Sequence, residues 1–256
     1  MRIAIIGHGN VATSMHEAFG AKGIRVPMLS AHDLLNGKDP DEQLAEGDTV
    51  ESLDVLIYAV CDTVLAEVVK AVRVPQRVLH VHTSGTMPLS IYGEDKPHCG
   101  ILYPFQTFSK AAPIADFTNI PIFVEARGID DISAMYTLAL TLSPRVFEAS
   151  QSERERLHVA GVFANNFTNC MYTIAAELLQ GTSIPFSALL PLIDQTAAKV
   201  HNLAPRDAQT GPAVRHDREV IEHHLDILRS LQAGPNKALN SHVPAEVYEL
   251  LSDYIQ

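Results

Sequence analysis

Several polar side chains in this sequence have the types and spacing that proton transfer needs. His158 and Asn165 stand seven residues apart in the helical run "RLHVAGVFANNF", which puts them on roughly the same helical face. Because histidine titrates near neutral pH, His158 could donate or accept a proton while Asn165 holds the substrate's oxygen or nitrogen. The alternative is a structural His158 that only bonds a backbone group at a domain interface.

A second group of polar residues follows two apolar, strand-like runs. "HTSG" comes after a buried-looking strand, and its Thr83, Ser84 and Gly85 are predicted to contact a substrate carboxylate or carbonyl. "YPFQTFS" ends the next run, and Tyr103 and Gln106 are predicted to line the same pocket. The alternatives are simple turn chemistry for the first motif and an aromatic plug for the second.

The segment "TGPAVRHD" is predicted to open a helix, with Thr210 as its N-cap. Arg215 could then reach a substrate carboxylate as a two-pronged donor. The alternative is a capped helix with a surface ion pair. His223 and His224 are adjacent and point apart on a helix, whereas zinc prefers histidines at i and i+4, so no metal site is predicted.

A glycine turn, "GHGNVA", lies between the apolar strand "IAII" and a helix predicted over residues 10–22. Its first glycine permits a tight turn, and its second lets the backbone approach a pyrophosphate that faces the N–H groups of the helix start. The alternative is a plain strand–helix corner. The predicted dinucleotide contacts are Gly7, Gly9, Asn10 and Val11, together with Val60 and Cys61 at the end of the strand "DVLIYAV".

The residues after the second strand bear on which dinucleotide would bind. An acidic residue about 20 positions beyond the glycines binds the ribose of NAD, but Ser30 stands there, and Ser30 and His32 could donate to the phosphate of NADP. Arg25 is near in sequence, and Asp33 could restore NAD binding if the strand ended later. We favour NADP over NAD; the remaining alternative is that adenosine recognition has decayed and no dinucleotide binds.

These motifs require a sheet that brings strand ends together. The apolar runs "IRVPML", "RVLHVHTSG", "HCGILYPF", "IPIFVEA" and "PRVFEAS" alternate with helices predicted over 62–72 and 129–142. This order predicts an α/β, Rossmann-type, doubly wound and mainly parallel sheet over residues 1–150. Residues 151–256 show only helical runs, at 153–179, 187–201, 216–231 and 244–255, and are predicted to form an all-helical domain.

Composition excludes several classes of function. The chain has 256 residues, 46% of them apolar, and a formal net charge of -11, which argues against a nucleic-acid partner. No apolar stretch is long enough to predict a membrane span. The three cysteines are far apart and no secretory signal is evident, so a cytoplasmic protein with free thiols is expected.

The motifs "HTSG", "YPFQTFS", "RLHVAGVFANNF" and "TGPAVRHD", in this order, resemble the DUF2520 family, a Rossmann-like domain joined to a helical domain of unknown function. That family is similar to the 6-phosphogluconate and 3-hydroxyisobutyrate dehydrogenase superfamily, which includes pyrroline-5-carboxylate reductases and F420-dependent NADP oxidoreductases. The resemblance implies an NAD(P)-binding oxidoreductase and a dimer formed through the helical domain. Val162 stands where the hydroxyacid dehydrogenases carry a lysine, which puts their ordinary chemistry in doubt.

These observations together predict an NAD(P)-dependent oxidoreductase that acts on a small carbonyl, hydroxyacid or imine substrate. Two alternatives stay open: a dinucleotide-binding sensor or partner-binding module without catalysis, and an imine reductase like the pyrroline-5-carboxylate enzymes. The run from Glu153 to Leu179 carries apolar residues around much of its circumference, more than a small helical domain could cover. A homodimer with a largely helical contact is therefore expected.

Overall fold

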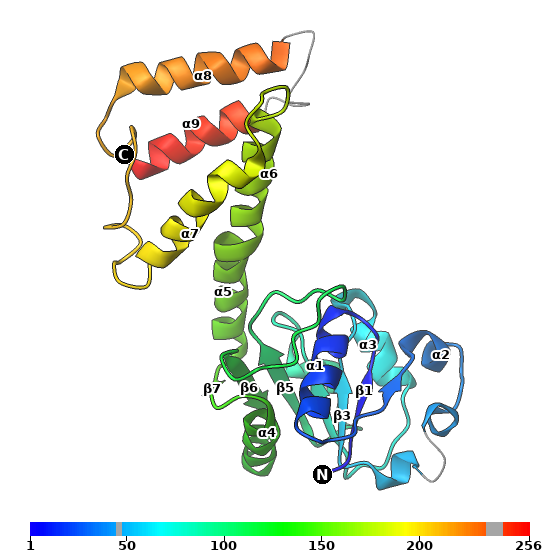
Figure 1. Cartoon of the computed structure of the whole chain (residues 1–256). Helices are drawn as coiled ribbons and strands as arrows, with labels where there is room; N and C mark the ends of the chain where they lie inside the picture. Colours follow the sequence, from blue (N-terminus) through cyan, green and yellow to red (C-terminus); the bar gives the residue numbers. More distant parts are fainter. Residues whose placement is uncertain (45–47, 234–242) are drawn as a thin grey trace. The chain divides into compact units, whose positions relative to one another are not determined.

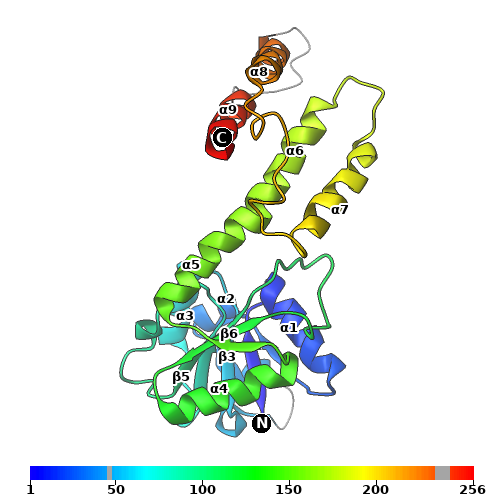
Figure 2. The same cartoon turned by 90° about the vertical axis from the view of Figure 1, so that its left-hand side faces the viewer.

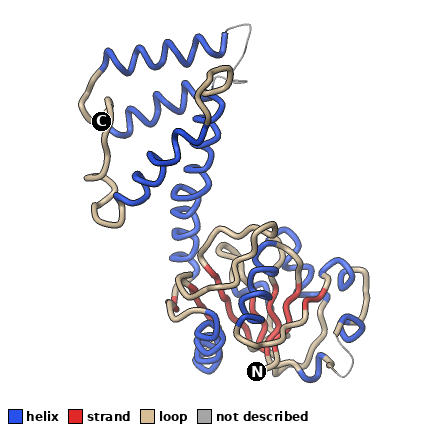
Figure 3. Tube along the Cα trace, in the orientation of Figure 1, coloured by secondary structure: helices blue, strands red, loops and turns tan. Residues whose placement is uncertain are grey.

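The computed structural model describes residues 1–44, 48–233 and 243–256. The chain forms two compact units, Met1–Val162 and Phe163–Gln256. The strands all lie in the first unit, and the second is built from helices (Figures 1 and 3).

The first unit is built on one seven-stranded sheet in the order β2-β1-β3-β4-β5-β6-β7. Strands β2, β1, β3, β4 and β5 are parallel, β6 is antiparallel to β5, and β7 is parallel to β6. This confirms the predicted mainly parallel, doubly wound architecture. The strands are β1 (Ile3–Ile6), β2 (Met28–Leu29), β3 (Val55–Tyr58), β4 (Leu79–His82), β5 (Cys99–Pro104), β6 (Ile122–Ala126) and β7 (Val146–Glu148).

Helices cover both faces of the sheet, which explains why β1 and β3 are apolar and buried at every position. One face packs Ile3, Ile5 and Ile57 against α1 (Asn10–Ala21) and α4 (Ile129–Leu142), and Figure 2 shows α4 beside β5 and β6. The other packs Ile6 and Leu56 against α2 (Ala31–Leu35) and α3 (Asp62–Ala71). Short 3₁₀ turns lie at Pro40–Gln43, Val50–Ser52 and Leu89–Tyr92.

The chain leaves β1 and β3 toward opposite faces, because α1 packs in one core and α3 in the other. The strand order reverses at this pair, so the carboxyl ends of β1 and β3 form the topological switch point. In open α/β sheets, ligands bind at such an edge.

The first unit also includes α5 (Gln151–Gly161), so the division falls one helix later than the predicted boundary at residue 150. A capping box starts this helix: the Ser150 N–H donates to Glu153 Oε2 at 2.8 Å. After α5 the chain makes a π-helical segment, Val162–Phe167, before α6 (Thr168–Leu178).

The second unit continues from α6 with a 3₁₀ turn at Phe186–Leu189, α7 (Leu190–Lys199), α8 (Arg218–Ala233) and α9 (Val243–Ile255). Its small core joins α8 to α9 through Ile221 and Leu225, with Tyr248 packed against them. Neither α6 nor α7 has a buried residue. Within the described residues, no helix is long and apolar enough to cross a membrane.

Candidate functional site

The turn between β1 and α1 has the geometry predicted from its glycines. Gly7 has φ 123°, and a Cβ there would lie 2.3 Å from the Ala59 carbonyl oxygen, so only glycine fits. Gly9 is extended, and a Cβ there would meet nothing within 4 Å. Because no side chain caps α1, its first N–H groups are open to an anion such as a pyrophosphate.

The end of β3 lies directly beside this turn. The Val60 side chain would be 3.2 Å from a Cβ at Gly7, and Cys61 is the N-cap residue of α3. Val11 is half-buried at the start of α1, whereas the Asn10 side chain is engaged: its Oδ1 accepts the Lys110 N–H at 3.0 Å. The predicted dinucleotide contacts around Gly7 and Gly9 therefore gather at one edge of the sheet.

Strand β2 ends at Leu29, as the sequence predicts, and Ser30 follows as the N-cap of α2. The Ser30 hydroxyl accepts the Asp33 N–H at 3.2 Å, and His32 is exposed to solvent. Asp33 lies within α2, where its carboxylate pairs with Lys38 at 3.5 Å. Arg25 precedes β2, pairs with Asp48 at 3.3 Å, and lines a hollow with Met1 at the amino edge of the sheet, so it cannot serve the same ligand as Ser30.

The "HTSG" motif forms a tight turn after β4. Thr83 is buried, and the Ser84 hydroxyl accepts the N–H groups of Thr86 and Met87, each at 3.1 Å. The Thr86 hydroxyl donates to Asp62 Oδ2 at 2.7 Å, which ties the turn to the start of α3. Ser84 thus shapes the turn, as the simpler interpretation of the motif predicted, while the turn itself lies at the carboxyl edge.

Two histidines on β4 are buried and stay neutral. Burial lowers the pKa of His82 to about 3, with a further contribution from Arg154, and its Nδ1 accepts the Ser84 N–H at 3.2 Å. Burial also lowers the pKa of His80 to about 4, and its Nδ1 lies 2.8 Å from the Tyr58 hydroxyl. Both side chains are parts of the packed core rather than proton carriers near pH 7.

His158 meets a residue from the sheet. Its Nδ1 lies 3.0 Å from the hydroxyl oxygen of Tyr103, near the carboxyl end of β5. Burial raises the pKa of Tyr103, so this hydroxyl keeps its proton near neutral pH. The Tyr103 ring packs on Gly85, where a Cβ would be 2.7 Å from the ring. This joins the "HTSG" and "YPFQTFS" motifs and the predicted proton carrier at one place.

Sequence reasoning missed Arg154, which connects the same elements. Its guanidinium is fully buried and donates to Glu125 on β6 and to the Gly85 carbonyl on the "HTSG" turn. In the sequence, "SERERL" is typical of a solvated helix surface, and arginine is rarely buried unless it is paired. The apolar spacing alone gave no signal for it.

Other predicted residues lie elsewhere. Gln106 is exposed, and its Oε1 accepts the neighbouring Thr107 N–H at 2.8 Å. Asn165 lies in the π-helical segment, where the chain no longer follows 3.6 residues per turn. Its seven-residue spacing from His158 therefore does not establish a shared face, and its role stays a prediction.

The predicted helix start at "TGPAVRHD" is wrong. Thr210 caps no helix, and α8 begins only at Arg218, where Asp217 accepts the Val220 N–H at 3.4 Å. The left-handed backbone of His216, φ 52°, breaks the helical path before that point. The substrate roles of Thr210 and Arg215 stay predictions.

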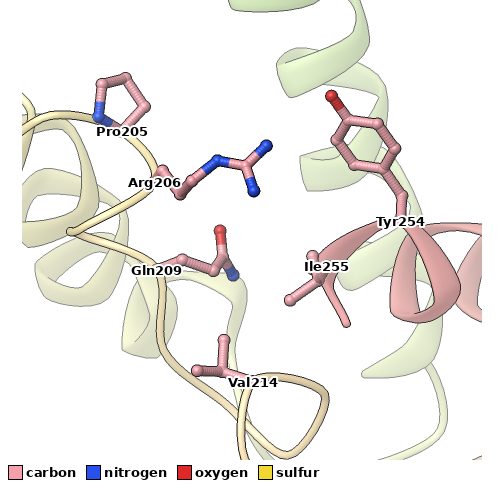
Figure 4. Close-up of a pocket in the computed structure, with 6 residues that line it drawn as sticks. All are labelled: Pro205, Arg206, Gln209, Val214, Tyr254 and Ile255. Carbon is pink, nitrogen blue, oxygen red and sulfur yellow. The ribbon is translucent and has the colours of Figure 1, made fainter.

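A cavity of about 410 Å³ lies in the second unit, between the 205–214 loop and α9. Figure 4 shows the polar ends of Arg206 and Gln209 on one side and the Tyr254 ring on the other. Thr210 and Arg215 do not line it. Sequence reasoning missed Arg206 and Gln209 because "LAPRDAQTGP" indicates only a break between helices.

A glycine turn at the switch point of a doubly wound sheet, followed by a helical unit, defines the class of dinucleotide-binding proteins with a Rossmann domain and a carboxyl-terminal helical domain. The chain belongs to the DUF2520 family, described as a domain of unknown function, whose model matches residues 120–255. No curated protein matches the sequence.

Solved structures agree with this assignment. A provisionally assigned NADP oxidoreductase from Bacteroides fragilis is 38% identical, with a TM-score of 0.79 over 99% of this chain and 97% of that one. A reductive aminase from Aspergillus terreus, in complex with NADPH and ethyl levulinate, is 14% identical, with a TM-score of 0.63 over 100% and 99% of the two chains. An imine reductase from Myxococcus stipitatus, in complex with NADP+, is 14% identical, with a TM-score of 0.59 over 99% and 95%. The last two show a shared fold.

Proposed function

We propose that this protein is an NAD(P)-dependent oxidoreductase acting on a small carbonyl, hydroxyacid or imine substrate. The observation that carries the proposal is the turn at Gly7 and Gly9, which leaves an uncapped helix start at the switch point of the sheet. The 38% identical Bacteroides fragilis protein, provisionally assigned as an NADP oxidoreductase, supports it.

The chain's own residues fit a dinucleotide at this edge. Gly9 offers backbone that nothing obstructs, and the pyrophosphate would face the first N–H groups of α1. Val60 and Cys61 would flank it from the end of β3. When bound, the dinucleotide supplies or receives the hydride.

We assign to His158 the transfer of the proton that accompanies hydride transfer. With Nδ1 engaged by the Tyr103 hydroxyl, Nε2 is the ring atom left to give a proton to the substrate's oxygen or nitrogen, or to take one in the reverse direction. Thr83 and Gly85 would bound the substrate from the turn after β4. Tyr103, near the end of β5, would hold the His158 ring in place during the reaction.

The preference for NADP over NAD is also proposed. No carboxylate stands at the end of β2, where Ser30 is found, and Asp33 is occupied within α2 by Lys38. A ribose phosphate could instead accept hydrogen bonds from the Ser30 hydroxyl and the exposed His32 ring. The free thiols of Cys61, Cys99 and Cys170 suit a reducing compartment such as the cytoplasm.

A homodimer is proposed as the working form. The second unit by itself leaves the apolar side chains of α6 and α7 uncovered, and a second copy of the chain would supply the missing cover.

The test of function separates an enzyme from a sensor. Calorimetry with NADPH and NADH should give binding, tighter for NADPH. Absorbance of NADPH should then fall on addition of a member of a panel of cyclic imines and 2- and 3-oxo acids. Binding without turnover across the panel would favour the sensor alternative, and failure of both dinucleotides to bind would refute the proposal.

A further inference from the structure

Arg154 is a charged side chain with no access to solvent. Its Nη2 and Nε donate to Glu125 Oε2 at 2.6 and 3.1 Å, and its Nη1 donates to the carbonyl oxygens of Gly85, at 3.1 Å, and Ser84, at 3.5 Å. A buried charge is stable only when it is paired and hydrogen-bonded in this way. The guanidinium therefore binds a strand on one side and the "HTSG" turn on the other.

The contacts of Arg154 lead back to its own helix. Arg154 donates to the carbonyl oxygen of Gly85, and the Tyr103 ring packs against the Cα of Gly85. The Tyr103 hydroxyl in turn lies 3.0 Å from His158 Nδ1. Residues 154 and 158 are four apart in α5 and so lie on one helical face. The contacts therefore begin and end on α5: they run from Arg154 to Gly85 on the turn, to Tyr103 on β5, and back to His158.

We propose that Arg154 is a positioning residue, which holds α5 and the "HTSG" turn in the register that brings Tyr103 to His158. The inference rests on the proposed function insofar as His158 is the proton carrier. Arginine suits this position because its planar fork can bind a carboxylate with one edge and a carbonyl with another. A lysine could keep the ion pair with Glu125 as a point charge, but it lacks the second planar edge that donates to the Gly85 carbonyl oxygen.

We expect Arg154→Lys to disturb the position of the His158 imidazole. Without the bond to Gly85, the turn relaxes, the Tyr103 ring moves with it, and Nδ1 of His158 loses its partner. Misplacement of a reacting group by about 1 Å lowers turnover by roughly a hundredfold. Glu125 would still be neutralised, so the fold would be kept.

The decisive measurement needs no substrate. Nitrogen-15 NMR of the full chain, with the His158 ring signals assigned from His158→Gln, reports whether Nδ1 is hydrogen-bonded. Tyr103→Phe should move the Nδ1 signal to the position of a ring without that bond, and Arg154→Lys should move it in the same direction. Arg156→Lys is the matched control, an exposed arginine two residues along the same helix, and should leave the signal unchanged.

Gly85→Ala tests the same contacts without touching the ion pair, because its Cβ would displace the Tyr103 ring. It also keeps the test decisive if Arg154→Lys fails to fold. In the double variant of Arg154→Lys and Tyr103→Phe, the signal should stay where Tyr103→Phe puts it, since both changes act through one bond. A parental Nδ1 signal in folded Arg154→Lys, or in Gly85→Ala, would overturn the inference. Neither result depends on NADPH oxidation, so failure here and failure of the proposed function are told apart.

Discussion

The two glycines of the β1–α1 turn have different physical roles. Gly7 is required by the fold, because its φ of 123° and the nearby Ala59 carbonyl leave no room for a Cβ. Gly9 faces open space in an extended conformation that any residue can adopt. A side chain at Gly9 would therefore obstruct a ligand rather than the protein.

This difference gives a paired prediction. Gly9→Val should fold with a free energy of unfolding within about 1 kcal/mol of the parent, because only the helix N-cap changes. Gly7→Ala should lose at least about 2 kcal/mol through backbone strain and the clash with Ala59. Urea unfolding measures both. In calorimetry, Gly9→Val should lose NADPH affinity, and parental affinity in this variant would move the dinucleotide to another site.

A second prediction concerns His158. If this side chain carries the proton, His158→Ala should lower turnover by about a hundredfold to ten-thousandfold, the usual contribution of general acid–base catalysis. The affinity for NADPH should stay nearly unchanged, because the imidazole meets Tyr103 and not the glycine turn. Steady-state kinetics with a substrate from the imine and oxo-acid panel checks this. Turnover within a fewfold of the parent would remove His158 from the mechanism, and weaker NADPH binding alone would make it structural.

At the scale of elements, the sheet could be predicted where local patterns decide the structure. The continuous apolar run at Ile3–Ile6 indicates a strand that is buried on both faces, and the structure has it so. The run "IRVPML" forms only the two-residue β2, because Pro27 has no N–H to continue the ladder. The start of α8 was misplaced because glycine and proline mark helix starts and turns alike.

The site could be predicted only in part, because local sequence patterns decide only some of its contacts. The glycine turn depends on neighbouring residues and was found, whereas the contact between Tyr103 and His158 joins residues 55 positions apart. The spacing of apolar residues within one element cannot predict a contact between residues so far apart in the sequence. Arg154 was missed since burial of an arginine depends on Glu125 and Gly85, which only the fold brings to it.

Strand β4 gives a prediction of its own. His80 and His82 are buried on one side of it, with folded pKa values lowered to about 4 and about 3, against about 6.5 for an unfolded histidine. The unfolded chain therefore binds more protons below pH 6.5, and stability falls as the pH falls through this window. Each histidine should remove at most about 2 kcal/mol between pH 6.5 and pH 5.

Urea unfolding at both pH values tests this. His82→Gln removes one titrating group and should reduce the loss of unfolding free energy between pH 6.5 and pH 5 by up to half of the histidine contribution. Carboxylates with lowered pKa values, such as Asp95 beside Lys96, lose their contribution only at more acidic pH. An equal loss in the parent and in His82→Gln would show that His82 is not buried in its neutral form.

At the scale of the whole molecule, the second unit has too little core for its apolar content. Among its described residues, the buried cluster draws on α8, α9 and the loop before α8, around Ala213, Ile221 and Leu225. On the other helices of this unit large side chains stay exposed, with 64% of Phe163 and 65% of Leu192 open to solvent. Exposed apolar side chains in such number are typical of an interaction surface, and the proposed two-fold dimer would cover them with a second copy of the chain.

The last prediction follows from that surface. Light scattering at micromolar concentration should give twice the chain mass of 27.9 kDa. Leu192→Glu, on α7, should shift the mass toward that of one chain, because a charge buried without a partner opposes association. Leu140→Glu is the matched control: this leucine is also exposed, at 56%, but lies on α4 of the first unit, and the variant should keep the parental mass. A parent of one-chain mass would refute the dimer, and equal dissociation by both variants would refute a contact through the helical unit.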